Sequence, residues 1–150
     1  MERVLCVDPS VTSTGWAYWD SLLEGDYVPP DVSGVVRGRG FDDSLQKFRH
    51  VLRTLPLVRK SIIEFPEVQQ NAAATQSGAL FKLAAVTGAY EALIWTEFGT
   101  RSTRVRPSTW KGQLPKKEVM RRIKEKLNMV TRDHEADAVG IGLWAVNGSV

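Results

Sequence analysis

The chain has 150 residues, 43% of them hydrophobic, which is expected of one globular domain spanning residues 1–150. Its single cysteine, Cys6, excludes an internal disulfide, and its place in an apolar run predicts a buried side chain in a reducing compartment. Charges such as Lys82 and Glu91 interrupt the longest apolar stretch, and the first residues have no signal-peptide pattern. We therefore expect a soluble, cytoplasmic protein without a membrane span.

The net charge of +3 conceals an uneven distribution. Residues 101–132 contain 11 basic and 2 acidic side chains, whereas the rest of the chain contains 9 basic and 15 acidic ones. A solvated helix face accounts for part of the basic segment, but the scarcity of acidic partners is better explained by a surface that binds a polyanion. Nucleic-acid phosphate is the usual partner of such a surface.

The first half of the chain predicts four strands and one helix. Val4–Asp8 and Thr14–Trp19 have the pattern of a hairpin, and Val32–Arg37 that of a third strand. A helix follows, with N-cap candidates at residues 42–44, an apolar face and a stop at Pro56. Ser61–Glu64 is a short fourth strand.

The second half predicts three helices and one strand. Residues 72–98 form a long helix that is apolar nearly all round and contains many small residues, which is typical of a helix buried within the domain or against a second subunit. Both alternatives stay open. Residues 103–106 alternate as a strand, residues 116–127 form an amphipathic helix, and a last helix covers residues 134–145, with Thr131 or Asp133 as its N-cap.

Four polar residues stand where these elements begin or end. Asp8 ends the first strand and is followed by Pro9, and Glu64 ends the fourth. His134 and Asp137 share one face of the last helix, and Asp137 lies on its apolar side, where a carboxylate needs a partner. Three acids and one imidazole favour Mg²⁺ or Mn²⁺, and this donor set suits two-metal hydrolysis of a phosphodiester.

Three segments resemble the acidic motifs of the RuvC-type Holliday junction resolvases, which belong to the RNase H-like superfamily. They are Asp8-Pro9-Ser10 with Thr14-Gly15, Ile62-Ile63-Glu64, and His134-Glu135-Ala136-Asp137-Ala138. Residues 106–112 and 116–119 are similar to the family's basic segment. The resemblance covers nearly the whole chain in the same order. It implies an α/β fold with a five-stranded mixed sheet, strands one to three antiparallel and flanked by helices, and a homodimer formed through the helix from Ala72.

The resemblance also implies a function: a metal-dependent endonuclease that resolves four-way DNA junctions by paired symmetrical nicks, leaving a 5′-phosphate and a 3′-hydroxyl. Two Mg²⁺ ions per active site are implied, with Mn²⁺ as a substitute. Asp8 would be the ligand shared by both ions, Glu64 and Asp137 would complete the two sites, and His134 would bind or position one ion and the water. The residues expected to contact DNA are Arg106, Lys111, Lys116, Lys117, Arg121 and Arg122.

The sequence departs from the family pattern at two places. Ser10 stands where relatives usually have glycine, so the turn after Asp8 must form without a positive φ there, or with the strain of one. The position three residues after Glu64, where relatives place an aromatic side chain against the junction, is Glu67. Phe65 or Phe81 would have to serve instead.

Three other functions are compatible with parts of the pattern. A related RNase H-like nuclease that cuts general branched DNA or RNA–DNA hybrids would keep the same four site residues. A sugar-kinase or actin-like ATPase also opens with a strand, an Asp and a Thr-Gly turn, but requires a second domain to enclose its nucleotide. A protein that binds junction or duplex DNA without cutting it would keep the basic surface and bind independently of metal.

Overall fold

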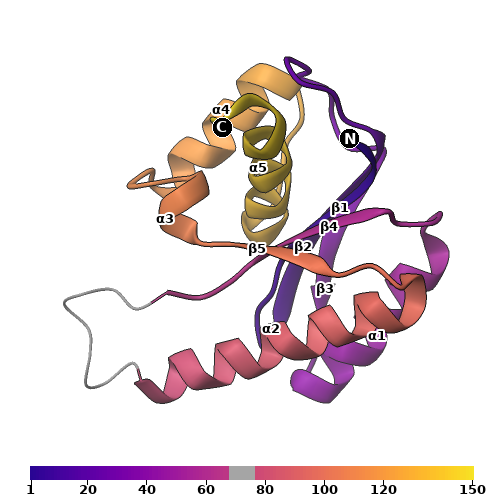
Figure 1. Cartoon of the computed structure of the whole chain (residues 1–150). Helices are drawn as coiled ribbons and strands as arrows, with labels where there is room; N and C mark the ends of the chain where they lie inside the picture. The colour runs from indigo at the N-terminus through magenta and orange to yellow at the C-terminus, as the bar shows by residue number, and fades with distance from the viewer. Residues whose placement is uncertain (68–76) are drawn as a thin grey trace.

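The fold is a mixed sheet with helices on both faces, as seen in a computed structural model that describes residues 1–67 and 77–150 (Figure 1). The five strands lie in the order β3-β2-β1-β4-β5. β1 pairs antiparallel with β2, and β2 with β3, whereas β1 with β4 and β4 with β5 are parallel. Their bounds are β1 Glu2–Asp8, β2 Ser13–Ser21, β3 Val32–Arg37, β4 Lys60–Glu64 and β5 Ser102–Val105. The predicted α/β class and the antiparallel strands one to three are confirmed.

The unbroken apolar run of β1 matches its place at the centre of the sheet. Val4 to Val7 are completely buried, because helices cover both faces of this strand. Cys6 lies within this run, and burial raises the pKa of its thiol, which keeps it protonated. The prediction that Cys6 is a small buried residue is confirmed.

The described residues also form five helices. α1 and α2 pack on one face of the sheet, and α3, α4 and α5 lie on the other (Figure 1). Their bounds are α1 Phe41–Thr54, α2 Ser77–Phe98, α3 Pro107–Trp110, α4 Lys116–Leu127 and α5 Asp133–Asn147. No helix in the described ranges is both long enough and apolar enough to cross a membrane.

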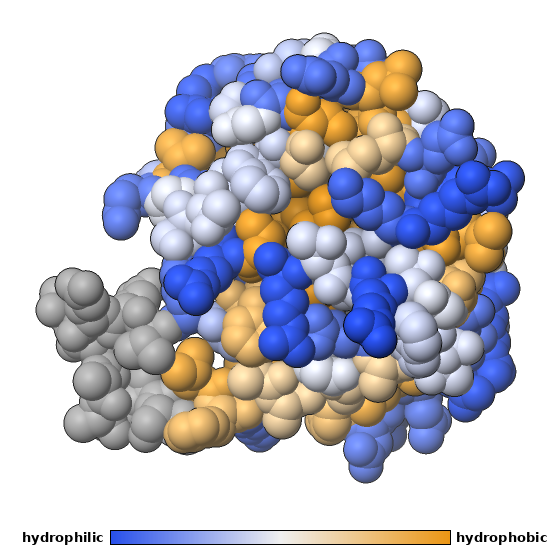
Figure 2. All heavy atoms as spheres, in the orientation of Figure 1, coloured by the Kyte–Doolittle hydropathy of each residue, from blue (hydrophilic) through white to orange (hydrophobic). Residues whose placement is uncertain are grey.

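The long helix α2 is buried on one side only. Val86, Tyr90 and Ile94 pack against the sheet and α1, whereas Phe81 and Trp95 on the opposite side are 74% and 51% exposed. Hydrophobic residues accordingly gather along α2 at the lower edge of Figure 2. Burial within the described chain therefore explains only half of its apolar surface. The predicted first turn of this helix, residues 72–76, lies outside the described residues.

The short helix α3 was not predicted from the sequence. Pro107 ends the strand before it, but proline is also favoured at the first position of a helix.

The start of α5 differs from the prediction and the turn after Asp8 matches it. Neither Thr131 nor Asp133 caps α5, because Arg132 is the N-cap and its backbone N–H donates to the carboxylate of Glu135 at 3.1 Å. The turn after Asp8 forms without a positive φ at Ser10, because the hydroxyl of Thr14 bonds both the N–H and the carbonyl of Ser10 at 3.2 Å.

Candidate metal centre

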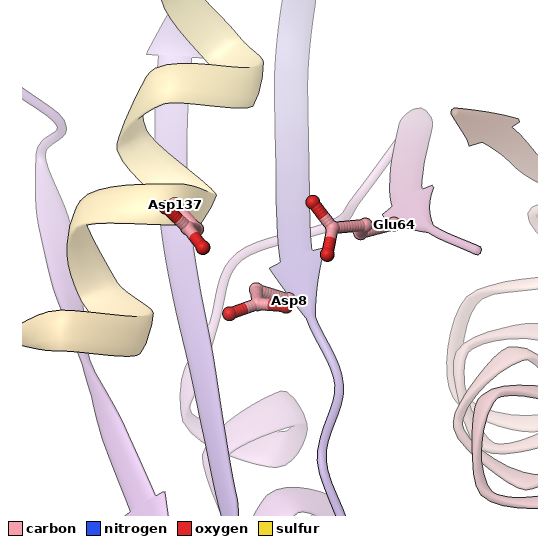
Figure 3. Close-up of side chains that lie close together, drawn as sticks. All are labelled: Asp8, Glu64 and Asp137. Atoms are coloured by element: carbon pink, nitrogen blue, oxygen red, sulfur yellow. The ribbon is translucent and has the colours of Figure 1, made fainter. Parts of the chain in front are cut away.

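Three carboxylates meet at one edge of the sheet. Asp8 ends β1, Glu64 ends β4 and Asp137 lies in the second turn of α5, and one oxygen from each lies within 4.8 Å of the others (Figure 3). Because β1 and β4 are parallel neighbours with Val7 paired to Ile63, their last residues end side by side. The three residues that the sequence singled out are thus brought together.

Gly15 on β2 sets the position of the third carboxylate. It pairs with Asp8 across the β1–β2 ladder, and a Cβ at Gly15 would lie only 1.9 Å from the backbone carbonyl oxygen of His134. Only a glycine lets the first turn of α5 approach the sheet this closely. This contact places His134 and Asp137 above the end of β1.

The fourth predicted residue, His134, contacts one member of the triad. Its Nδ1 lies 2.7 Å from Oδ2 of Asp8. Burial raises the pKa of Asp8, and the hydrogen bond to Asp8 raises the pKa of His134. The Asp8–His134 pair therefore keeps one shared proton to a higher pH than an isolated Asp or His side chain would keep its own. Since Nδ1 is engaged with Asp8, Nε2 is the ring atom left to contact a ligand.

Glu64 receives its hydrogen bond from an aromatic side chain. The indole N–H of Trp110, the last residue of α3, donates to Oε2 of Glu64 at 2.6 Å. Burial, followed by the negative charge of Asp8, raises the pKa of Glu64 to about 8, although this hydrogen bond acts in the opposite direction. Clustered buried acids thus hold protons that a divalent cation would displace.

Asp137 is contacted by two lysines. Its Oδ2 accepts hydrogen bonds from Lys116 and, at 3.1 Å, from Lys111. Lys116 also pairs with Asp133 at 2.7 Å, and the Lys111 ammonium lies 3.9 Å from Glu64. Both predicted phosphate-binding lysines therefore lie at the site, in contact with its carboxylates.

The donor set fits a hard divalent cation. All three groups are oxygen donors, and Asp8 and Asp137 are only 5% and 2% exposed. The buried Oδ1 of Asp137 has no hydrogen-bond partner among the described residues, and such an orphaned oxygen is costly unless a ligand satisfies it. Asp8, Glu64 and Asp137 could therefore hold a metal ion of the Mg²⁺ type.

The remaining predicted DNA contacts lie outside the centre. Arg106 is the N-cap of α3, Lys117 follows Lys116 on α4, and both are exposed. Arg121 pairs with Glu118 and Glu125 on its own helix. Arg122 pairs with Glu118 at 3.0 Å and donates to the carbonyl of Val150.

Trp110 and Gly15 take part in the site without having been predicted as site residues. The partner of Trp110 lies 46 positions earlier, so no local pattern joins the two. The indole also requires Gly140 on α5, where a Cβ would lie 2.6 Å from Cζ3 of Trp110. For Gly15 a signal was present, since it follows Thr14 directly after the turn at Asp8, but the need for glycine comes from α5, about 120 residues later in the chain.

Comparison with known proteins adds evidence on the fold. No protein-family model and no curated protein sequence matches the chain. A solved structure of RuvC from Thermus thermophilus in complex with a Holliday junction substrate matches with a TM-score of 0.70 and 17% identity, over 95% of this chain and 92% of that one. A second T. thermophilus RuvC structure matches with a TM-score of 0.60 and 20% identity, over 95% and 94%. The chain therefore has the fold of RuvC.

Proposed function

We propose that this protein is a metal-dependent, structure-selective endonuclease that resolves four-way DNA junctions by paired symmetrical nicks. The observation that carries the proposal is the buried triad of Asp8, Glu64 and Asp137, whose oxygens lie within 4.8 Å of one another. Packing three acids together is unfavourable in a structural core, so their convergence on one point favours a cation-dependent role. The RuvC fold supplies the reaction class by analogy.

Each carboxylate has a role that follows from its position. Asp8 lies between the other two in the sheet and helix arrangement, so it is the ligand common to two metal sites, which Glu64 and Asp137 complete (Figure 3). Two Mg²⁺ ions held by these residues, or Mn²⁺ in their place, would lower the pKa of an attacking water and stabilise the leaving oxygen, and hydrolysis would leave a 5′-phosphate and a 3′-hydroxyl.

His134 and the two lysines act on the substrate side of the carboxylates. The Nδ1 contact with Asp8 fixes the imidazole ring, so that Nε2 can position the water and accept its proton. The ammonium groups of Lys111 and Lys116 hold the phosphate that is cut or its neighbour, because their side chains are 20% and 32% exposed and reach the centre from the residue after α3 and from the first residue of α4.

The substrate assignment rests on charge and on the structural neighbour. RuvC of T. thermophilus binds a Holliday junction, and the exposed Arg106 and Lys117 extend the positive surface away from the triad. Arg101, directly before the edge strand β5, is another exposed basic group of this segment, whereas Arg104 on β5 already pairs with Glu91 at 2.8 Å. A phosphate backbone laid along this side would contact both regions and the catalytic lysines.

A homodimer would cover the exposed face of α2. Residues along this face recur at intervals of three and four, the spacing of a helix that packs against another helix. Glycine and alanine occupy the middle of the row, and an aromatic residue lies near each end. The row consists of Gly78, Phe81, Ala85, Gly88, Ala92 and Trp95.

This row is compatible with two-fold symmetry about Gly88. Phe81 and Trp95 each lie seven residues from Gly88, so two antiparallel copies of α2 would set Phe81 against Trp95 of the partner subunit. A Cβ at Gly88 would meet no atom within 4 Å, which leaves room for a second backbone to approach. Such a dimer presents two active sites, as paired nicking requires.

The dimer is tested by cross-linking. Gly88→Cys should form a disulfide-linked dimer under mild oxidation, since the buried Cys6 does not compete. Ala79→Cys, exposed on α2 but a half-turn away around the helix, is the matched control and should stay monomeric on denaturing gels. Equal cross-linking of both variants, or a wild type that sediments as a monomer, would contradict the interface.

The function is tested by a substrate panel. Mg²⁺-dependent cleavage is compared on a four-way DNA junction, a plain duplex, a three-way branch and an RNA–DNA hybrid. Selective cutting of the four-way junction supports the resolvase. Preferential cutting of the hybrid, or of all branched DNA, would retain the metal centre but assign the protein to the alternative, a related RNase H-like nuclease with another substrate. Metal-independent binding without cleavage would refute both.

A further inference from the structure

The two lysines at Asp137 bind one of its two carboxylate oxygens, Oδ2, and leave the other, Oδ1, without a partner among the described residues. The ammonium groups of Lys111 and Lys116 both bind Oδ2 of Asp137, and this carboxylate is nearly inaccessible to solvent. Lys111 also lies 3.9 Å from Oε2 of Glu64. Two positive charges therefore sit directly against two of the three acids, where they stabilise the negative charge as a bound cation would.

This arrangement sets the lysines and a divalent cation in competition. A metal ion bound through either oxygen of Asp137 would lie close to two ammonium groups, and like charges at such distances repel strongly where water is excluded. Metal binding to the free protein is consequently weakened by the energy needed to move Lys111 and Lys116. The third acid, Asp8, is hydrogen-bonded to His134 at 2.7 Å and has no direct contact with either lysine among the described residues.

The chain around the lysines allows them to move. Lys111 follows the short helix α3 and precedes Gly112, which has a φ of +57°, and Lys116 is the first residue of α4. Each has a long aliphatic stem that ends at a partly exposed ammonium, so a rotation toward solvent requires no change in the sheet. Phosphate oxygens outside the site would then be their partners.

We propose that Lys111 and Lys116 exchange between Asp137 and a DNA phosphate, so that phosphodiester binding and divalent metal binding strengthen each other. The inference rests on the proposed function for the identity of the phosphodiester. The free protein holds its metal weakly because the lysines engage Asp137, and DNA removes them from this carboxylate. By linkage, a metal that binds Asp137 releases the same lysines for the phosphate.

The first test measures Mn²⁺ affinity without DNA by isothermal titration calorimetry. Lys116→Met keeps the aliphatic stem and removes the charge, and it should bind Mn²⁺ about fivefold or more tightly than the wild type. Lys111→Met should shift the affinity in the same direction. Lys124→Met is the matched control and should leave it unchanged, because Lys124 is exposed on α4 and no contact of it with the triad is present in the described part of the chain. Circular dichroism checks that all three variants fold.

The second test measures how much DNA binding strengthens Mn²⁺ binding. Mn²⁺ is titrated into the wild type with and without a four-way junction that carries phosphorothioate linkages throughout its core. The junction should raise the wild-type affinity about fivefold or more, and the Lys111→Met/Lys116→Met double variant should lose most of this increase. An unchanged or weaker Mn²⁺ affinity in Lys116→Met would overturn the inference while leaving the proposed function intact. Failure of the wild type to bind Mn²⁺ even with the junction present would overturn both.

Discussion

The indole N–H of Trp110 donates a 2.6 Å hydrogen bond to Oε2 of Glu64, joining α3 to the end of β4. The indole itself is buried and fits against Gly140 on α5. One aromatic side chain thus connects a carboxylate of the triad with the helix that carries another. Trp110 therefore holds the carboxylate of Glu64 in place, without being a candidate metal ligand itself.

Trp110→Phe should preserve the packing and remove the donor. A hydrogen bond to a charged group contributes about 1.5–3 kcal/mol, so we expect Mn²⁺ affinity to fall by about tenfold or more. Because this hydrogen bond lowers the pKa of Glu64, its loss should also move the pH dependence of metal binding to higher pH. Calorimetric titrations from pH 6 to pH 9 measure both effects.

The control for this variant is Trp144→Phe. Trp144 packs partly against the same core from α5, and no hydrogen bond of its indole is found within the described residues. It should change unfolding stability without moving the pH profile of metal binding. If Trp110→Phe and Trp144→Phe gave the same profile, Trp110 would have only a packing role.

Gly15→Ala should disturb the approach of α5 to the sheet. The added methyl group would meet the backbone of His134 and Glu135, which has no flexible end to move aside. Overpacking of this kind costs about 1–3 kcal/mol, and we expect a loss of this size in the free energy of unfolding measured with urea, together with weaker metal binding. Gly40→Ala is the control, since Gly40 has extended backbone and a Cβ there meets nothing within 4 Å. Equal stability of the two variants would contradict the account of Gly15.

The metal-free protein should lose stability as the pH rises. Glu64 has a pKa of about 8 in the folded protein against an ordinary value of 4.5, so between these values the folded state binds more protons than the unfolded chain. The free energy of unfolding therefore decreases with rising pH in this window, and the raised pKa values of Asp8 and His134 act in the same direction.

Urea denaturation at pH 5 and pH 8 measures this decrease. Saturating Mg²⁺ should remove most of it, because a bound cation stabilises the ionised carboxylates. Glu64→Gln, which cannot ionise, should show a smaller decrease without metal. Stability that rises from pH 5 to pH 8 in the metal-free wild type would contradict the description of the triad.

Two basic residues should dominate the salt dependence of DNA binding. Each phosphate contact contributes about 0.9 to the slope of log K against log salt concentration, so Arg106→Gln and Lys117→Gln should each reduce it by about 1. Arg121→Gln should reduce it less, because Arg121 already pairs with Glu118 and Glu125. Fluorescence anisotropy at several salt concentrations gives the slopes. A larger effect of Arg121→Gln than of Arg106→Gln and Lys117→Gln would contradict this assignment.

The sequence predicted the strands and the acids well because both depend on local chemistry. The apolar run of β1 and the carboxylates at the ends of β1 and β4 are features of neighbouring residues, and parallel pairing then brings Asp8 and Glu64 together. Asp137 was identified because a carboxylate on an apolar helix face requires a partner. One oxygen of each of the three carboxylates lies within 4.8 Å of the others, and their role as metal ligands stays a prediction.

The contacts around the acids could not be predicted in the same way. The bond from Trp110 to Glu64 and the pairing of Lys116 with Asp137 join residues from separate elements, and they depend on how α3 and α4 pack against α5. The cap at Arg132 was missed because its acceptor is the side chain of Glu135, whereas Thr131 and Asp133 have the side chains that usually cap helices. The contacts of Trp110 and Lys116 therefore depend on how the helices pack together, which the local sequence does not specify.

Paired cleavage is tested most directly with a supercoiled plasmid that carries an extruded cruciform. The wild type with Mg²⁺ should convert this plasmid mainly to linear DNA, because a dimer would nick opposing strands of one junction within the lifetime of the complex. Asp8→Asn should bind the junction and leave the plasmid intact. Nicked circles as the only product would contradict paired cleavage, and cleavage by Asp8→Asn at the wild-type rate would contradict the assignment of the triad as the catalytic centre.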